Sequence, residues 1–258
     1  MTQSTRKPTV LIVPGSFSHA SFYTPIVDQL SAQGYEALAI DLPTVGRRED
    51  GPAPTMADDA AHVHSVAVKF VDEGKDVVLL THSYGGIVGT ESANGLAKAD
   101  REAAGKKGGI SRLIYLTSIV PPVGGSLAST TEGQADLGFL KTDGDYMYHD
   151  IPKSLPYTLS DLPEAEALAW AERTPQHSAV SFTGELTYPA YKYIPVSYIV
   201  CEADKILTPS FQREMVGRIA KESGRDVDVH VCNTGHCPNL SAPEVVVELV
   251  VNAIEKDL

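Results

Sequence analysis

Six short apolar segments, spread along almost the whole chain, limit the folds open to this sequence more than any other feature. Strands that are covered on both faces of a sheet show continuous apolar runs of this kind, rich in β-branched residues. They therefore predict six strands of a parallel sheet. The segments are 10–13 (VLIV), 37–40 (ALAI), 77–80 (VVLL), 113–116 (LIYL), 196–200 (VSYIV) and 228–232 (DVHVC).

The stretches between these segments carry apolar residues at intervals of three and four, which is the period of a helix with one buried face. Ser241, followed by Pro243 and Glu244, is predicted to cap the last of these helices. Strands that alternate with helices are typical of an α/β fold in which helices cover both faces of the sheet. The predicted helices are 21–32, 57–73, 86–104, 208–222 and 242–256.

The alternation is interrupted between residues 121 and 192, a stretch rich in Pro, Gly, Tyr and acidic residues that contains no good core strand. Its best helical segment is 161–174 (DLPEAEALAWAERT). An insertion of this kind in a parallel sheet is expected to cover the carboxyl ends of the strands, where ligands bind. We therefore predict a single domain over residues 1–258, with a lid inserted at about 121–192.

The charge and the cysteines restrict what the chain can bind. With 33 acidic and 21 basic side chains the net charge is −12, which disfavours nucleic acid and anionic membranes as partners. Cys201, Cys232 and Cys237 form no CxxC pair, so neither a disulfide framework nor a zinc site is expected. The amino terminus, MTQSTRKPTV, lacks the apolar stretch of a signal peptide. We expect a cytoplasmic protein that acts on a small molecule, of unknown oligomeric state.

The strand at 77–80 runs directly into His82-Ser83-Tyr84-Gly85-Gly86 and then into a predicted helix. This strand, turn and helix resemble the nucleophile elbow, G-x-S-x-G, of the α/β hydrolases, in which a tight turn lifts a serine above the sheet. Thr81 stands in place of the first glycine, and Gly85 keeps the second small residue. The resemblance extends over nearly the whole chain and implies an α/β-hydrolase fold with Ser83 as the nucleophile.

A serine hydroxyl needs a base within hydrogen-bond reach and an acid that orients the base. The resemblance implies the chain order serine, acid, histidine. Asp204 follows the strand at 196–200, and His236 follows the strand at 228–232. Glu202 is the alternative acid, because residues two apart on an extended segment point the same way. The predicted catalytic triad is Ser83, Asp204 and His236.

Acyl transfer develops an oxyanion, which backbone N–H groups can stabilise. The resemblance implies that these N–H groups belong to Tyr84 and to Ser16 of the loop VPGSFSHASF, where Pro14 replaces the family's histidine. We expect substrate contacts from Phe17, His82 and Tyr148, and His19 and His149 are further candidates for the pocket. Aromatic residues of the lid, among them Trp170 and Phe182, favour an apolar or aromatic ligand.

Within the family, residues 201–215 (CEADKILTPSFQREM) resemble the acid loop of plant methyl esterases and hydroxynitrile lyases. Those lyases carry a threonine at the position of Gly15 and a lysine at the position of Cys237, so the resemblance is nearer to the esterases. It implies a serine hydrolase that cleaves a small carboxylic ester or lactone through an acyl-enzyme, without cofactor or metal. The alternatives are a cofactor-free lyase that cleaves or rearranges a carbon–carbon bond and a non-catalytic small-ligand binder.

Overall fold

The six predicted strands form one sheet in the computed structural model, which describes residues 7–256. The strand order is β2-β1-β3-β4-β8-β9, and all neighbouring strands run parallel. Residues 1–6 and 257–258 lie outside the described residues. Most of the amino-terminal segment MTQSTRKPTV, which was predicted not to be a signal peptide, therefore lies outside them too. The strands are β1 (Thr9–Val13), β2 (Ala37–Ala39), β3 (Asp76–His82), β4 (Gly109–Leu116), β8 (Val196–Cys201) and β9 (Asp228–Cys232).

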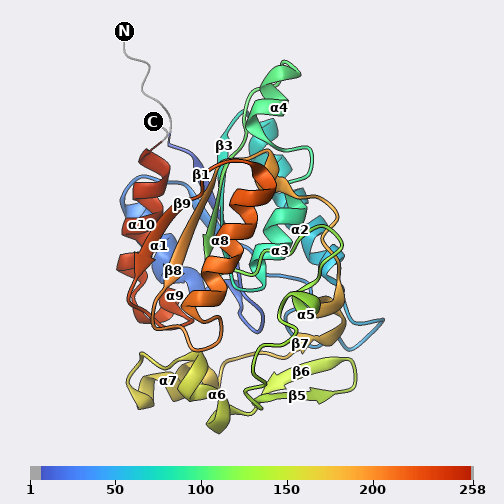
Figure 1. Ribbon diagram of the computed structural model, residues 1–258, viewed down its shortest axis with the longest axis vertical. Coiled ribbons are helices and arrows are strands. Elements are labelled where there is room, and N and C mark those ends of the chain that lie inside the picture. Colours follow the sequence, from blue (N-terminus) through green and yellow to red (C-terminus); the bar gives the residue numbers. More distant parts are fainter. Residues whose placement is uncertain (1–6, 257–258) are drawn as a thin grey trace.

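Helices cover both faces of this sheet (Figure 1). On one face α1 (Thr24–Ala32) packs beside α10 (Pro243–Glu255), and on the other lie α2 (Met56–Asp72), α3 (Gly85–Ser92) and α8 (Pro209–Ser223). Within β1, Val10 and Ile12 pack in the apolar core on the side of α1 and α10. Leu11 and Val13 pack in the core on the side of α2, α3 and α8. The strand sequences are continuously apolar because both of their faces are buried.

Two predictions about the helices that flank the main sheet were wrong. The helix expected over 86–104 is divided into α3 and α4 (Lys98–Ala103), because the chain turns at Gly95, whose φ of 73° suits glycine. Ser241 does not cap α10: it ends the short helix α9 (Pro238–Ser241), and its hydroxyl donates to Asp161 instead. No helix among residues 7–256 combines the length and apolarity needed to cross a membrane.

Residues 121–192 are called the insertion below. They form a second sheet and several short helices, which lie beyond the end of the main sheet that is near α9 (Figure 1). The predicted helix at 161–174 is shorter, over Glu164–Ala171. The insertion contains α5 (Leu127–Thr130), β5 (Leu140–Asp143), β6 (Tyr146–His149), α6 (Ile151–Thr158), α7 (Glu164–Ala171), β7 (His177–Ser178) and the 3-10 helices η2 (Ala179–Thr183) and η3 (Ala190–Lys192). A further 3-10 helix, η1 (Ala20–Tyr23), precedes α1.

Helix α3 lies unusually close to strand β3, and this closeness explains Thr81. A side-chain carbon added to Gly89 would overlap the Thr81 methyl group, so Thr81 occupies space that Gly89 leaves open. The Thr81 hydroxyl lies 3.2 Å from the Ser118 hydroxyl and is fully buried. The threonine that replaces the first glycine of the elbow is thus accommodated by a glycine on the following helix.

We predict that Gly89→Ala lowers the free energy of unfolding by about 1–3 kcal/mol, because overpacking of this contact outweighs the better helix propensity of alanine. Thr81→Ser removes only the methyl group, and in that background Gly89→Ala should be neutral or stabilising. Urea unfolding of the four proteins in this double-mutant cycle measures the coupling. Equal effects of Gly89→Ala in both backgrounds would contradict the packing account.

Candidate active site

Ser83 occupies a sharp turn between β3 and α3, with a φ of 51° that non-glycine residues rarely adopt. Its carbonyl oxygen accepts hydrogen bonds from the N–H groups of Gly86 and Ile119, each at 3.0 Å. A side-chain carbon at Gly85 would overlap the carbonyl oxygen of Val13, and one at Gly86 would lie 2.5 Å from the carbonyl oxygen of Ile119. The two glycines therefore let the neighbouring loops hold the serine in its strained position.

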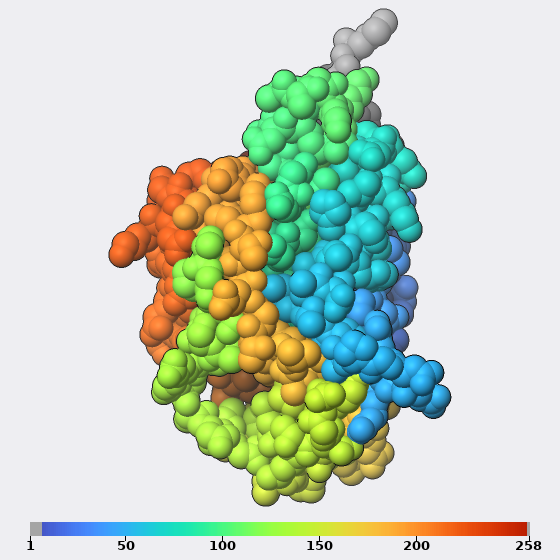
Figure 2. All heavy atoms as spheres, turned by 90° about the vertical axis from the view of Figure 1, so that its right-hand side faces the viewer, coloured from blue at the N-terminus to red at the C-terminus, as the bar shows by residue number. Residues whose placement is uncertain are grey.

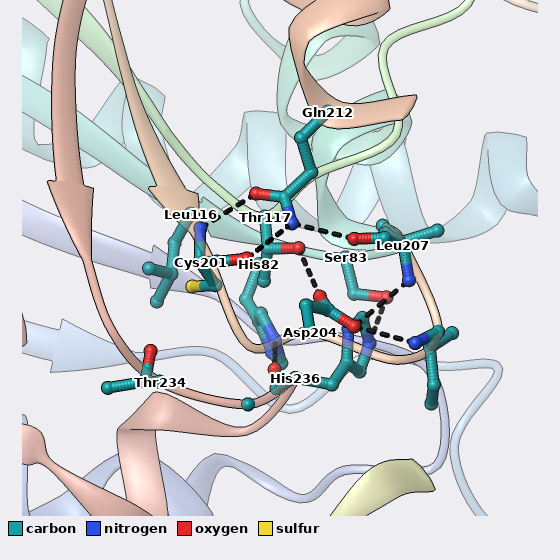
Figure 3. Close-up of polar contacts among 12 residues, drawn as sticks. His82, Ser83, Leu116, Thr117, Cys201, Asp204, Leu207, Gln212, Thr234 and His236 are labelled. Atoms are coloured by element: carbon teal, nitrogen blue, oxygen red, sulfur yellow. Dashed lines mark hydrogen bonds and ion pairs between the residues drawn. The ribbon is translucent and has the colours of Figure 1, made fainter. Parts of the chain in front are cut away.

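The structure brings the three residues of the predicted triad together (Figure 3). The Ser83 Oγ lies 3.1 Å from His236 Nε2, and His236 Nδ1 lies 2.7 Å from Asp204 Oδ2. Since a carboxylate only accepts, Nδ1 carries the imidazole proton and Nε2 is free to accept from the serine. This is the arrangement that nucleophilic catalysis by a serine requires.

Asp204 is almost completely buried, yet it is held as a carboxylate. Burial alone would raise its pKa, but the charge of His236 and hydrogen bonds from His236, Thr117 and the backbone outweigh it, so the pKa is lowered. The Thr117 hydroxyl donates to Oδ2 at 2.6 Å, and the N–H groups of Ile206 and Leu207 donate to Oδ1 at 2.7 and 3.0 Å. A charged Asp204 can hold His236 and stabilise its protonated form.

Glu202, the alternative acid, points elsewhere and pairs with Arg213 at the surface. The loop that carries Asp204, between β8 and α8, is braced by Gln212, a residue that was not predicted to contribute to the site. Its amide accepts from the Cys201 N–H at 2.9 Å and donates to the carbonyl oxygens of Cys201 and Leu207 at 3.0 and 2.6 Å (Figure 3). Gln212 is fully buried and joins the end of β8 to the far side of the acid loop.

The backbone N–H groups of Ser16 and Tyr84 make no hydrogen bond within residues 7–256. The amides on either side of Ser16 are engaged: the Gly15 N–H donates to the Tyr23 hydroxyl at 3.0 Å and the Phe17 N–H to His177 Nδ1 at 3.4 Å. The loop is thus held on both sides of Ser16, while the Ser16 amide stays available to a ligand.

A buried carboxylate holds the side chain of Tyr84 from behind. Asp59, in the first turn of α2, accepts from the Tyr84 hydroxyl at 2.7 Å and from the Thr44 hydroxyl and N–H at 2.6 and 2.9 Å. Burial raises the pKa of Asp59 to about 6, against the effect of these donors. Asp59 was not predicted, because an acidic residue in the first turn of a helix normally faces solvent.

His82 connects the loops of the site. Its Nδ1 lies 2.7 Å from the Tyr23 hydroxyl, and its Nε2 lies 2.7 Å from the carbonyl oxygen of His236. The carbonyl oxygen can only accept, so Nε2 carries the proton and Nδ1 accepts from Tyr23, which in turn accepts from Gly15. Burial lowers the pKa of His82 to about 3, with a smaller contribution from the charge of His236. A neutral His82 ties the Gly15 loop to the His236 loop.

A cavity of about 340 Å³ lies above Ser83 and His236, between the main sheet and the insertion. Figure 2 shows a hollow beneath the green segment that leads into the insertion. Phe17 and His82, from which substrate contacts were expected, both line the cavity. Tyr148 does not: it is 40% exposed, because alternate residues of β6 face opposite ways and His149 faces the cavity instead. The expectation for Tyr148 is therefore corrected.

The cavity is mainly apolar and aromatic. Of the aromatic residues expected there, Trp170 and Phe182 line it, and Phe22 and Phe139 are additions that the sequence did not indicate. His19 lies outside the cavity and approaches Asp41 at 3.6 Å. Among residues 7–256, no three His, Cys, Asp or Glu side chains are grouped so as to hold a metal ion.

Comparison with known proteins places these features in context. Residues 10–249 match the sequence model of the Alpha/beta hydrolase family. The chain is 35% identical over 245 residues to "Probable hydrolase R7" of Phoma sp., covering 95% of this chain and 97% of that one.

Solved structures share the fold at lower identity. Polyneuridine aldehyde esterase matches with a TM-score of 0.73 and 19% identity, over 96% of this chain and 99% of that one. Methylesterase MES16 from Arabidopsis matches with a TM-score of 0.72 and 18% identity, also over 96% and 99%. The predicted fold, a mainly parallel sheet of six strands flanked by helices, is confirmed.

We predict that the protein loses stability as the pH falls below about 6.5, the ordinary pKa of histidine in an unfolded chain. Burial lowers the pKa of His82, His149 and His177 to about 3, 4 and 3, so all three take up protons on unfolding. Asp59 opposes this, since its raised pKa means that it releases a proton on unfolding between about pH 4 and 6. The net uptake of about two protons corresponds to about 2–3 kcal/mol per pH unit near pH 5.

Urea unfolding at pH 7, 6 and 5 measures this dependence. His149→Phe removes one of the three imidazoles whose pKa is lowered and should make the dependence shallower by about one proton. His62 is exposed on α2, so His62→Gln is the matched control that should leave the slope unchanged. A free energy of unfolding that stays constant from pH 7 to 5 would contradict the buried neutral state of these histidines.

Proposed function

The chain belongs to the alpha/beta hydrolase family, and on that basis we propose that it is a serine hydrolase that cleaves a small carboxylic ester or lactone. One observation carries the proposal: the continuous hydrogen-bonded line from Ser83 through His236 to Asp204 at the floor of a cavity. The N–H groups of Ser16 and Tyr84, which make no hydrogen bond to any residue that the structure describes, support it further.

In the proposed reaction the Ser83 Oγ attacks the ester carbonyl while His236 Nε2 takes its proton. Asp204 stabilises the imidazolium, and the N–H groups of Ser16 and Tyr84 donate to the oxyanion of the tetrahedral intermediate. The carbon–oxygen bond to the alcohol then breaks, and His236 returns the proton to the departing oxygen. Water, deprotonated by His236, attacks the acyl-enzyme, and collapse of the second intermediate releases the acid and restores Ser83.

The walls of the cavity support an apolar or aromatic substrate. Phe22, Phe139, Trp170 and Phe182 surround a space of about 340 Å³, which is the size of a small-molecule site. Aromatic walls gain free energy by removing apolar surface of a ligand from water. We therefore place an aryl or alkyl ester, rather than a charged or large polar one, among the substrates of the enzyme.

The surroundings of Gly15 and Cys237 favour hydrolysis over lyase chemistry. A side-chain carbon at Gly15 would lie 3.1 Å from His82 Nδ1 and 3.2 Å from the Ser83 Cβ, so the threonine of the lyase pattern would crowd the serine. Burial raises the pKa of the Cys237 thiol, which therefore stays neutral and cannot replace a lysine as a positive charge. A ligand binder without catalysis would not need a strained serine at this turn.

We predict that the protein hydrolyses p-nitrophenyl butyrate and that Ser83→Ala lowers kcat/KM at least about a thousandfold. The melting temperature should change little, since the substitution removes one hydroxyl at the tip of a turn. Cleavage of mandelonitrile should be negligible. Efficient cleavage of mandelonitrile without hydrolysis of any ester would replace the esterase proposal by the lyase alternative, and binding without turnover of either would favour the non-catalytic binder.

A second prediction separates the two acids of the same loop. Asp204→Asn should lower kcat by about a thousandfold or more, because the amide cannot stabilise the imidazolium and favours the wrong tautomer of His236. Glu202→Gln is the matched control: it removes one surface ion pair with Arg213 and should leave kcat within about twofold. The reverse ranking would assign the acid to Glu202.

A further inference from the structure

His149, the last residue of β6, presents an imidazole to the cavity that has no hydrogen-bond partner among residues 7–256. Its ring packs against two aromatic rings, with centroids 4.3 Å from Phe17 and 5.1 Å from Phe139. The two rings fix the plane of the imidazole. His149 is therefore held in place by apolar contacts while its polar atoms remain free.

Besides His236 of the predicted triad, two buried histidines lie near the cavity, and both differ from His149 in this respect. His82 is bonded at both ring nitrogens, and His177 accepts from the Phe17 N–H and lies 3.0 Å from the Ser181 hydroxyl. His149 is only partly buried, and a phenylalanine at position 149 could keep the aromatic contacts without offering the cavity a donor or an acceptor. An imidazole at this position is consistent with a partner supplied by a ligand.

At neutral pH this imidazole is uncharged. Burial lowers the pKa of His149 to about 4, and the charge of His236 across the cavity lowers it further. Its ring therefore offers one N–H donor and one nitrogen acceptor. Such a group suits a neutral oxygen of the substrate, either a hydroxyl or a carbonyl.

The position of His149 indicates where this substrate oxygen would lie with respect to the reacting carbonyl. Phe17, whose ring it contacts, directly follows Ser16, whose N–H is proposed to bind the oxyanion. We propose that His149 is a specificity-determining residue that hydrogen-bonds a hydroxyl or keto oxygen close to the scissile carbonyl. The substrates would then be hydroxy or oxo esters and lactones with an otherwise apolar body. The inference rests on the proposed function, which supplies the ester carbonyl that Ser83 attacks.

Matched esters test this inference. One series of probes varies the acyl group: p-nitrophenyl hexanoate and its 2-hydroxy, 3-hydroxy and 3-oxo derivatives. The other varies the phenol: hexanoate esters of phenols that carry either a hydroxymethyl group or hydrogen at the same position. The wild type should prefer at least one oxygenated ester over its plain counterpart by about tenfold in kcat/KM, the size expected for one buried hydrogen bond. His149→Phe should reduce this ratio to less than about twofold.

The ratio cancels any general loss of activity that the variant suffers. Tyr148→Phe is the control, because it changes the neighbouring residue of β6, which lies outside the cavity and is 40% exposed; the ratio should not move. If His149→Phe does not fold, His149→Leu takes its place. A wild type without preference, or a variant that lowers both rates equally and keeps the ratio, would overturn the inference.

Binding separates this inference from the proposed function. The propylamides of hexanoic acid and of its three oxygenated derivatives are titrated into Ser83→Ala and into Ser83→Ala/His149→Phe, where no turnover is needed. A preference for an oxygenated amide that disappears with His149 supports the inference even if the wild type hydrolyses no ester, in which case only the proposed function fails. If the wild type hydrolyses esters and no amide is preferred, only the inference fails.

Discussion

The close approach of backbone to backbone around Ser83 is the constraint on which the rest of the site depends. Gly85 lies against the carbonyl oxygen of Val13, and Gly86 lies against that of Ile119, so the loops after β1 and β4 are packed directly onto the elbow. The first of these loops carries Ser16. The second begins with Thr117, itself at a φ of 35°, whose hydroxyl bonds Asp204. Proximity of the loops thus follows from the absence of two side chains.

Buried polar residues then hold each loop in its orientation. Asp59 fixes Tyr84, His82 joins the loops of Gly15 and His236, and Gln212 braces the acid loop. Each would cost free energy if it were buried alone, but each has its partners, so their burial restricts the loops without a large loss of stability. Asp59 and Gln212 do not line the cavity, so they can position the reacting atoms without contact with substrate, whereas His82 lines it.

The main sheet could be predicted from sequence because its strands are local apolar runs, and the resemblance to the α/β hydrolases indicated which serine, acid and histidine after strand ends the structure would bring together. Asp59 and Gln212 could not be predicted, since single polar residues in amphipathic helices look like surface residues until the tertiary contacts are known. The choice between Tyr148 and His149 could not be made from sequence, because the run Tyr-Met-Tyr-His shows no alternation of polar and apolar residues that would reveal which face is buried.

The insertion does more than cover the cavity, because it also holds part of the proposed catalytic apparatus. Phe17 belongs to the loop after β1, yet its N–H donates to His177 of β7 and its ring packs on His149 of β6. If β6 and β7 moved away, Phe17 would lose both contacts, and its φ of 58° would lose the interactions that stabilise it. The neighbouring Ser16 N–H would then no longer be oriented. In the proposed reaction, substrate recognition by the insertion and stabilisation of the oxyanion would therefore be physically coupled through Phe17.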